Sequence, residues 1–313
     1  MKLSEEVEKM VAEIGDDLVS GAAELALRAV NVFRASLVEC LSDSSVGEAK
    51  ERLTETARAI VKAHPAMAPM YNLGSAVLNA ADASSTVAEV ETKCSQAITD
   101  FESKLCQSAS AIADLVFGLI PAGENVFAYS FSSTVVSSFL AARARKKFFR
   151  AICTEARPSN EGRRLATMLS SGGLEVAHSF DLALGLILPT CRAAFMGVDC
   201  VGRPGLVNKV GSWMLALACR ELKIPLYALA GTEKFVPDDV FFAFEDHVRP
   251  GAECWTNAPQ GVKVLNHQYE MVPFNWITGL VTDEGILREA QIEEYVNRVH
   301  VHPRLEELAI ASF

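Results

Sequence analysis

The hydrophobic pattern of this sequence changes at Pro121-Ala122-Gly123, and that change constrains the fold more than any other feature. Before it, apolar residues recur at three- and four-residue steps, which is typical of helices with one buried face. After it, short apolar runs alternate with segments that begin on small or polar residues, which predicts strands alternating with helices. We therefore expect an α/β protein, with a helical bundle domain over residues 1–121 and a Rossmann-like ligand-binding domain with a mostly parallel sheet over residues 122–313.

The first part is expected to be almost purely helical. Apolar residues recurring from Ile14 to Phe33 predict one long helix. Residues 47–63 predict another, which ends at His64-Pro65 because a residue before proline is pushed out of the helical conformation. Ser84-Ser85 can cap a third long helix that reaches about Phe117.

The second part is expected to form a sheet with helices on both faces. Its strands are expected at residues 126–129, 148–154, 174–177, 193–198, 225–230, 271–274 and 280–282. Helices are expected from Lys209 to Leu222 and from Arg288 to His300, and the segment 236–270 is expected to be rich in loops. Ligands of such sheets bind at the carboxyl ends of the strands, so we look for a site there.

Composition narrows the classes of function. The chain has 313 residues and a formal net charge of -10, so direct nucleic-acid binding is not expected. The eight cysteines include no CxxC pair, and the scattered histidines suggest no metal site. Buried, reduced cysteines suit a cytoplasmic protein. No apolar run approaches the roughly 20 residues of a membrane span, and no signal peptide is evident, so no membrane association is expected.

Serines after the first expected strand form one candidate anion site. Ser130, Ser132 and Ser133 open a helix, where hydroxyls and free backbone N–H groups can hold a phosphate. Plain N-capping is an equally good reading of these serines. The sequence contains no GxGxxG or GxxxxGK[ST] fingerprint, so no nicotinamide or Walker-type nucleotide cofactor is expected. The surroundings of Ser130 lack a GxSxG elbow, which argues against a serine hydrolase.

Five further polar residues are candidates for a ligand site near the ends of expected strands. The Arg157 guanidinium can bind a phosphate or carboxylate, or pair with Glu155 or Glu161 at the surface. Asp199 ends an apolar strand, where a carboxylate serves either chemistry or the adjacent Gly202–Gly205 turn.

Asn208 is expected either to cap a helix or to bind a ligand. Lys209 at the positive end of that helix favours a nearby anion. Lys234 follows the strand at 225–230, and so lies at the same edge of the expected sheet.

The ordered motifs of the second part resemble a known family. Its segments E-x-R-P…G, GAD…NG…NKIGT and YKF are matched by Thr154–Pro158 with Glu161-Gly162, by Gly197–Asp199 through Gly205 with Asn208–Ser212, and by Glu233–Phe235. The family comprises the α/β/δ regulatory subunits of translation initiation factor 2B, ribose-1,5-bisphosphate isomerase and methylthioribose-1-phosphate isomerase. Weaker matches occur at His64–Pro69 and Pro273–Gly285. The resemblance implies a helical N-terminal domain, a Rossmann-like second domain, and homodimers that can build hexamers.

Departures from the family pattern bear on activity. The isomerases of this family carry a catalytic cysteine in a T-H-C-N segment, and Ser130 stands in its place. A serine hydroxyl is a much weaker acid than a thiol, so it is poorly suited to proton transfer. Asp199, the second catalytic carboxylate that the resemblance implies, is kept, whereas Gly231 and Glu233 replace the glutamate and tyrosine of E-T-Y-K-F.

Three functions remain open from the sequence. The favoured one is a non-catalytic regulatory protein, similar to the factor 2B subunits, that binds a sugar phosphate or nucleotide monophosphate through Ser130, Ser132, Ser133, Arg157, Asp199, Asn208, Lys209 and Lys234, and acts through protein contacts. The alternative is an aldose–ketose isomerase of a phosphorylated sugar in which Asp199 moves the proton. The third is a scaffold with an empty pocket.

Overall fold

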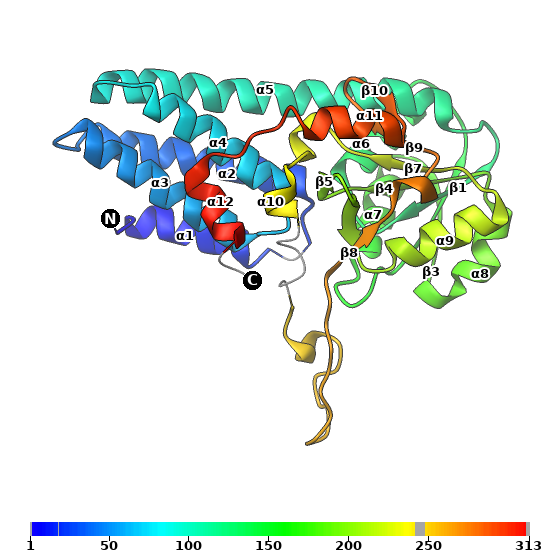
Figure 1. Cartoon of the computed structure of the whole chain (residues 1–313). Coiled ribbons are helices and arrows are strands. Elements are labelled where there is room, and N and C mark those ends of the chain that lie inside the picture. The colour runs from blue at the N-terminus through cyan, green and yellow to red at the C-terminus, as the bar shows by residue number, and fades with distance from the viewer. Residues whose placement is uncertain (1, 18, 242–247, 311–313) are drawn as a thin grey trace.

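The helical part comes first in the chain and lies beside an α/β part, as Figure 1 shows. The computed structural model describes residues 2–17, 19–241 and 248–310. The first five helices are α1 (Glu5–Gly15), α2 (Ala22–Cys40), α3 (Val46–Ala63), α4 (Ala68–Asp82) and α5 (Val87–Leu119). They share one apolar core, in which Phe33, Leu53 and Tyr71 are almost fully buried.

The single long helix expected from Ile14 to Phe33 is wrong, because the chain breaks between α1 and α2. The Asp17 carboxylate accepts hydrogen bonds from the backbone N–H groups of Val19 and Ser20, at 2.9 and 2.8 Å. Such local side-chain bonds compete with helix formation. The expected cap at Ser84-Ser85 is also displaced, since Thr86 accepts the bond from the Glu89 N–H that begins α5.

The second part contains a seven-stranded sheet in the order β10-β9-β7-β4-β1-β2-β3, and β10 alone among these runs antiparallel to its neighbour. The strands are β1 (Asn125–Tyr129), β2 (Arg150–Thr154), β3 (Glu175–Ser179), β4 (Ala193–Gly197), β7 (Leu226–Leu229), β9 (Gly279–Thr282) and β10 (Gly285–Leu287). The helices that follow its parallel strands are α6 (Ser133–Ala144), α7 (Glu161–Ser171), α8 (Leu184–Ile187) and α9 (Ser212–Leu222). The expected mostly parallel sheet is therefore confirmed.

Burial on both faces of this sheet explains the continuous apolar runs of its central strands. Successive side chains of a strand point to opposite faces. In β1, Phe127 and Tyr129 join the core beneath α9, whereas Val126 and Ala128 join the core beneath α5 and α6. The strand order reverses between β1 and β4, so a crevice is expected where these two strands end.

A second, antiparallel sheet joins the two parts and was not expected. It consists of β5 (Cys200–Gly202), β6 (Gly205–Lys209) and β8 (Tyr269–Val272). Its residues Cys200 and Val207 pack into the core of the N-terminal helices. The strand β6 thus occupies residues that we expected in a turn and at the start of a helix.

The expected helix from Lys209 to Leu222 is therefore wrong at its beginning, because α9 starts only at Ser212. Gly211 adopts a φ of 104° at the N-cap, where a Cβ atom would lie 1.9 Å from the Tyr129 hydroxyl oxygen. The Glu270 carboxylate accepts hydrogen bonds from the backbone N–H groups of Gly211 and Trp213, each at 2.6 Å. This contact from β8 fixes the first turn of α9.

The C-terminal segment returns to the N-terminal helices. After α11 (Glu289–Val296), α12 (Pro303–Ile310) packs against α3, and the Arg304 guanidinium donates to the Thr54 hydroxyl at 2.7 Å. Of the expected loop-rich segment 236–270, residues 242–247 lie outside the described residues, and α10 (Asp238–Phe241) is helical. Residues 248–268 project from the body between α10 and β8 (Figure 1). No helix of the described ranges is long and apolar enough to cross a membrane.

Candidate functional site

A small cavity lies where the two central strands of the large sheet end. Ser130 follows β1 and Asp199 follows β4, so the reversal of strand order brings them to the same crevice. Lys209, at the end of β6, also lines the cavity. Its wall also includes Asp17, Val19, Ser20 and Gly21, between α1 and α2, together with His64, Met67, Arg249, Gln268 and Tyr269. The volume is only about 40 Å³, whereas a single water needs roughly 10–15 Å³.

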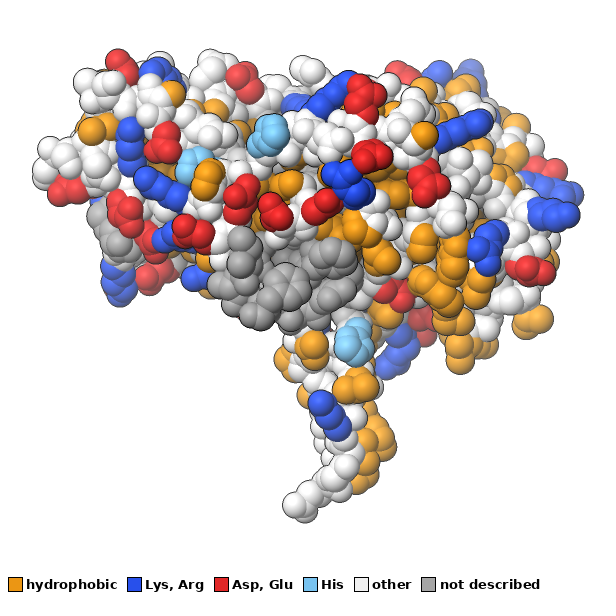
Figure 2. All heavy atoms as spheres, viewed as in Figure 1, with side chains coloured by type: hydrophobic (Ala, Val, Ile, Leu, Met, Phe, Trp, Pro, Cys, Tyr) orange, Lys and Arg blue, Asp and Glu red, His pale blue; other side chains and the backbone are white. Residues whose placement is uncertain are grey.

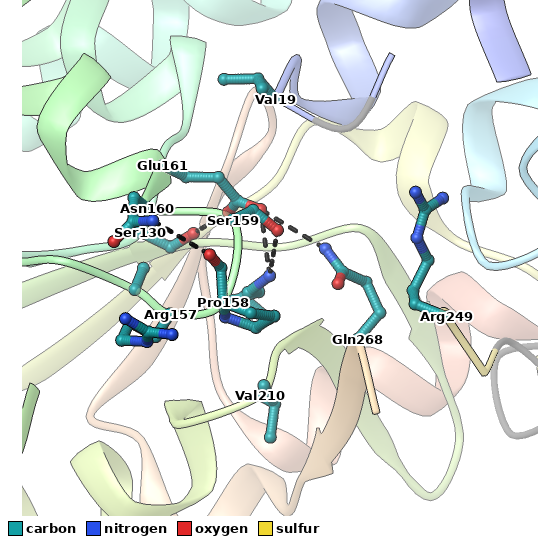
Figure 3. A network of polar contacts seen from close by, with 12 residues as sticks. Val19, Ser130, Arg157, Pro158, Ser159, Asn160, Glu161, Val210, Arg249 and Gln268 are labelled. Atoms are coloured by element: carbon teal, nitrogen blue, oxygen red, sulfur yellow. Dashed lines mark hydrogen bonds and ion pairs between the residues drawn. The ribbon is translucent and has the colours of Figure 1, made fainter. Parts of the chain in front are cut away.

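A buried carboxylate holds the centre of this site. Glu161 Oε1 accepts a hydrogen bond from Lys209 Nζ at 3.1 Å, and its Oε2 accepts one from Ser130 Oγ at 2.5 Å. Gln268 Nε2 donates to Oε1 at 3.4 Å, and Lys209 Nζ also donates to Ser159 Oγ at 3.1 Å. Figure 3 shows Ser130 and Gln268 directed toward the Glu161 carboxylate. Glu161 is 8% exposed and Lys209 3%, so the ion pair is shielded from water.

Local backbone geometry places Glu161 at this point. It is the first residue of α7, where the free N–H groups of the helix favour a negative charge. The next residue, Gly162, lets the helix approach β2 closely, since a Cβ atom there would lie 1.7 Å from the Thr154 carbonyl oxygen. Ser130 adopts a φ of 60°, which turns the chain sharply between β1 and α6.

Asp199 is a carboxyl of the cavity lining whose pKa is shifted by its surroundings. Burial raises the pKa of its carboxyl to about 6, although Lys234 and Lys209 act in the opposite direction. Its backbone is anchored on both sides, because its N–H donates to Val207 and its carbonyl accepts from Ala68. A carboxyl group that titrates near neutrality inside a cavity is suited to general acid–base work.

Charges of both signs line the cavity. Asp17, Glu161 and Asp199 supply three carboxylates, and Lys209 and Arg249 supply two cations. The Arg249 guanidinium pairs with Glu253 at 2.9 Å. An anionic ligand at this site would therefore have to compete with Glu161 for Lys209. No described residues form a group of three or more His, Cys, Asp or Glu side chains that could hold a metal ion.

The structure brings together half of the residues predicted to bind a ligand. Ser130, Asp199, Asn208 and Lys209 line the cavity. Lys234 lies behind Asp199, where its Nζ donates to the Val198 carbonyl at 2.6 Å. Asn208 lies in β6 rather than at a helix N-cap, and its amide nitrogen donates to Ser212 Oγ at 2.8 Å.

Besides Lys234, three predicted residues lie outside the cavity lining. Ser132 is the N-cap of α6 and accepts from the Val135 N–H, while Ser133 lines a different cavity. Arg157 is exposed, and its side chain points away from Glu161 in Figure 3. The alternative surface ion pair of Arg157 with Glu155 or Glu161 does not form. Glu155 pairs with Arg163 instead, and Glu161 pairs with Lys209.

Glu161, Arg249, Gln268, Tyr269 and Asp17 were missed as site residues. Glu161 was visible in the E-x-R-P…G motif, but a glutamate at a helix start is usually exposed and gives no sign of burial. No thiol replaces the cysteine that is missing at position 130. Cys200 follows Asp199 directly, but burial raises the pKa of its thiol well above the ordinary value. All eight cysteines are free, and six of them are buried, as expected.

Comparison with known proteins identifies the family. The model of the initiation factor 2 subunit family matches residues 18–289. This chain belongs to that family. A translation initiation factor eIF-2B subunit 2-like protein of Pyrococcus horikoshii is 31% identical, over 91% of this chain and 97% of its own length. A ribose 1,5-bisphosphate isomerase of Methanocaldococcus jannaschii is 23% identical, over 86% of this chain and 87% of its own.

Solved structures of the family share the fold. The crystal structure of translation initiation factor eIF-2B from Pyrococcus horikoshii superposes with a TM-score of 0.77, at 26% identity, covering 91% of this chain and 98% of that one. The family resemblance read from the sequence is therefore confirmed, as is the helical part followed by a mostly parallel sheet. Initiation-factor subunits and isomerases both occur among the relatives, so the choice between these two functions depends on the residues of the site.

Proposed function

We propose that this initiation factor 2 family member is a non-catalytic regulatory protein that binds a sugar phosphate or nucleotide monophosphate. One observation carries the proposal. Ser130 stands where the resemblance places the isomerases' catalytic cysteine, and its hydroxyl donates to Glu161 at 2.5 Å. A hydroxyl bound to a carboxylate and itself weakly acidic is a poor proton donor for isomerisation.

The cavity is small, so the proposed ligand would have to replace some of the hydrogen bonds that Glu161 makes. Its phosphate would take Lys209 as cation, and Ser130 and Asn208 would supply neutral contacts. Since the buried ion pair is already formed, binding needs a rearrangement of the segment that carries Glu161. We divide the chain into domains of residues 1–121 and 122–313, which would hold the ligand between them. The same proposal includes a cytoplasmic role in translation.

Thermal shift with ribose 5-phosphate, adenosine monophosphate and ribose 1,5-bisphosphate tests binding. At least one of these phosphates is expected to raise the melting temperature, because a ligand of the native state stabilises it by mass action. Lys209→Gln should abolish the shift, while Lys62→Gln, an exposed lysine on α3, should leave it unchanged. Turnover of ribose 1,5-bisphosphate, lost in Asp199→Asn, would refute the non-catalytic assignment.

A second candidate, aldose–ketose isomerisation of a phosphorylated sugar, is favoured by the Asp199 carboxyl alone. Its pKa of about 6 matches the need of a group that takes a proton from one carbon and returns it to the next. NMR of a panel of aldose phosphates incubated with the protein would reveal ketose product. If none forms with any member of the panel, this candidate is excluded.

Self-association is also part of the proposal. Figure 2 shows hydrophobic side chains gathered over α8 and α9. Exposed apolar residues of these helices and of the segment before α8 include Phe180, Leu182, Leu186, Trp213 and Met214, at 40–85% exposure. An exposed apolar face of this kind marks an interaction site. A related structure from C. thermophilum is described as a tetrameric eIF2B complex.

We therefore propose that the α8–α9 face is the contact of a homodimer, which could build a hexamer or bind a further protein partner. Light scattering after size exclusion should give the mass of a dimer or a multiple of it. Leu186→Glu should lower that mass to the monomer, whereas Val38→Glu, at another exposed apolar residue on α2, should not. A wild-type monomer at all concentrations would contradict this part of the proposal.

A further inference from the structure

A second cavity lies between α2, α5 and α6, on the other side of the turn that begins α6. Its volume is about 320 Å³. Apolar side chains form most of the wall, namely Ala23, Leu27, Leu105, Ala109 and Ile112. Leu27 and Cys106 are exposed, so they lie where the cavity meets solvent. A site of this size and lining is typical of pockets that take small organic ligands.

Two polar atoms of this cavity wall have no partner among the described residues. They are Glu233 Oε2 and Ser108 Oγ, and their residues are 6% and 3% exposed. Both atoms converge on Gly231, since a Cβ atom built there would lie 2.1 Å from the carboxylate oxygen and 2.2 Å from the hydroxyl. A buried polar group without a partner is costly, which indicates that a group from outside the chain completes it.

The position of Glu233 is fixed by its backbone rather than by its carboxylate. It lies in a short helix, Thr232–Lys234, directly after β7. The Asn72 amide on α4 donates to the carbonyl oxygens of Glu233 and Phe235, at 2.6 and 2.9 Å. The Glu233 side chain thus lines the cavity, while its Oε2 atom has no hydrogen-bond partner among the described residues.

Charge decides which ligand this wall can take. The ionisable lining residues Glu24 and Glu233 are both acidic, and no lysine or arginine lines the cavity in the described chain. Both carboxylate oxygens of Glu24 already accept from the Arg164 guanidinium, at 2.8 and 3.0 Å. An anionic ligand would meet the unpaired Glu233 carboxylate oxygen, whereas a cationic hydrogen-bond donor would satisfy it.

We propose that this cavity binds a small amine with an apolar body, whose ammonium group contacts Glu233 and Ser108 while its apolar part fills the space against Leu27, Leu105 and Ile112. The inference is independent of the phosphate site, which has other lining residues and opposite ligand chemistry. Burial raises the pKa of Glu233, opposed by Lys234 and by the exposed Lys104, with Asp283 adding to the rise. Amine binding therefore strengthens as pH rises and the carboxyl ionises.

Calorimetric titration of the full chain with three probes of one shape tests the proposal. The probes are 2-phenylethylamine, 2-phenylethanol and phenylacetate, which differ in charge. The amine should bind at least about tenfold more tightly than the alcohol, because a hydrogen bond to a charged group is stronger than a neutral one. Phenylacetate should bind most weakly. Equal affinities for amine and alcohol would overturn the proposal.

Two variants locate the binding. Glu233→Gln should remove the preference for the amine over the alcohol, while Glu221→Gln, an exposed carboxylate on α9, should keep it. Ala109→Leu should fill the cavity and weaken all binding, whereas Ala88→Leu, exposed on the same helix, should not. Melting curves without ligand show that each variant is folded. Unchanged amine binding in either cavity variant would reject this location.

Discussion

The two cavities described above contain glutamates of similar burial, but the hydrogen bonding of the two carboxylates differs. Glu161 accepts hydrogen bonds from Lys209, Ser130 and Gln268, and its charge is balanced by the lysine. Glu233 leaves one carboxylate oxygen without a partner. The difference teaches that burial alone does not identify a binding group. A satisfied carboxylate stabilises the fold and must be displaced, whereas an unsatisfied one is available to a ligand.

The largest change in the free energy of unfolding is expected for Glu161→Gln. The substitution removes the negative charge and leaves Lys209 buried at 3% exposure without its partner. Breaking a buried pair in this way costs about 3–5 kcal/mol of unfolding free energy. Urea unfolding measures it, and adding Lys209→Met should recover most of the loss, because the pair is then removed together. A loss below about 1 kcal/mol would show that the pair contributes little.

The next largest effect is expected for Asp199→Asn. Because the pKa rises from its ordinary 3.8 to about 6 on folding, the folded protein holds this proton more tightly than the unfolded chain does. Stability is therefore lost as pH rises from about 4 to 6, by up to about 3 kcal/mol. The asparagine variant should lack this fall and be more stable at pH 7. Urea unfolding across pH 4–8 checks it, with the exposed Asp239→Asn as control.

A moderate loss is expected for Gly231→Ala. The added Cβ atom would lie 2.1 Å from Glu233 Oε2 and 2.2 Å from Ser108 Oγ, so both side chains would have to move. Overpacking of this kind typically costs about 1–3 kcal/mol. Thermal unfolding measures the loss. Gly185→Ala is the matched control, since nothing lies within 4 Å of a Cβ atom at that position, and its melting temperature should hardly change.

The smallest change in the free energy of unfolding is expected for Glu233→Gln, measured without ligand. The amide carries no charge to desolvate, so the variant should be as stable as the wild type or more stable by up to about 1 kcal/mol at pH 7. The contrast with Glu161→Gln is the sharpest form of the comparison, because the same chemical change is made at two buried sites. Similar losses at both positions would show that Glu233 has a partner after all.

The sequence predicted the features that depend on local pattern. The strands near 126–129 and 193–198 follow from continuous apolar runs, and the reversal of strand order then brings Ser130 and Asp199 together. It did not predict the hairpin of β5 and β6. Those strands are short, and the pairing of Gly202 with Gly205 looks like a turn when it is seen as sequence alone.

Long-range pairing explains what was missed in the site. Glu161 is buried only because Lys209, 48 residues away, and Gln268, 107 residues away, meet it in space. Gly211 and Glu270 delay the start of α9 through another contact of this kind. No periodicity or propensity within a short window encodes such meetings, so they become visible only in the folded chain.

The two cavities border the same two segments of the chain, and this has a thermodynamic consequence. Gly21 and Ser130 line the first cavity, while Ala23, Glu24 and Ser133 line the second, so the start of α2 and the turn before α6 belong to both. A ligand in one cavity that shifts these two segments changes the free energy of ligand binding in the other cavity. Such coupling is reciprocal by necessity: whatever factor an amine imposes on phosphate affinity, the phosphate imposes on the amine.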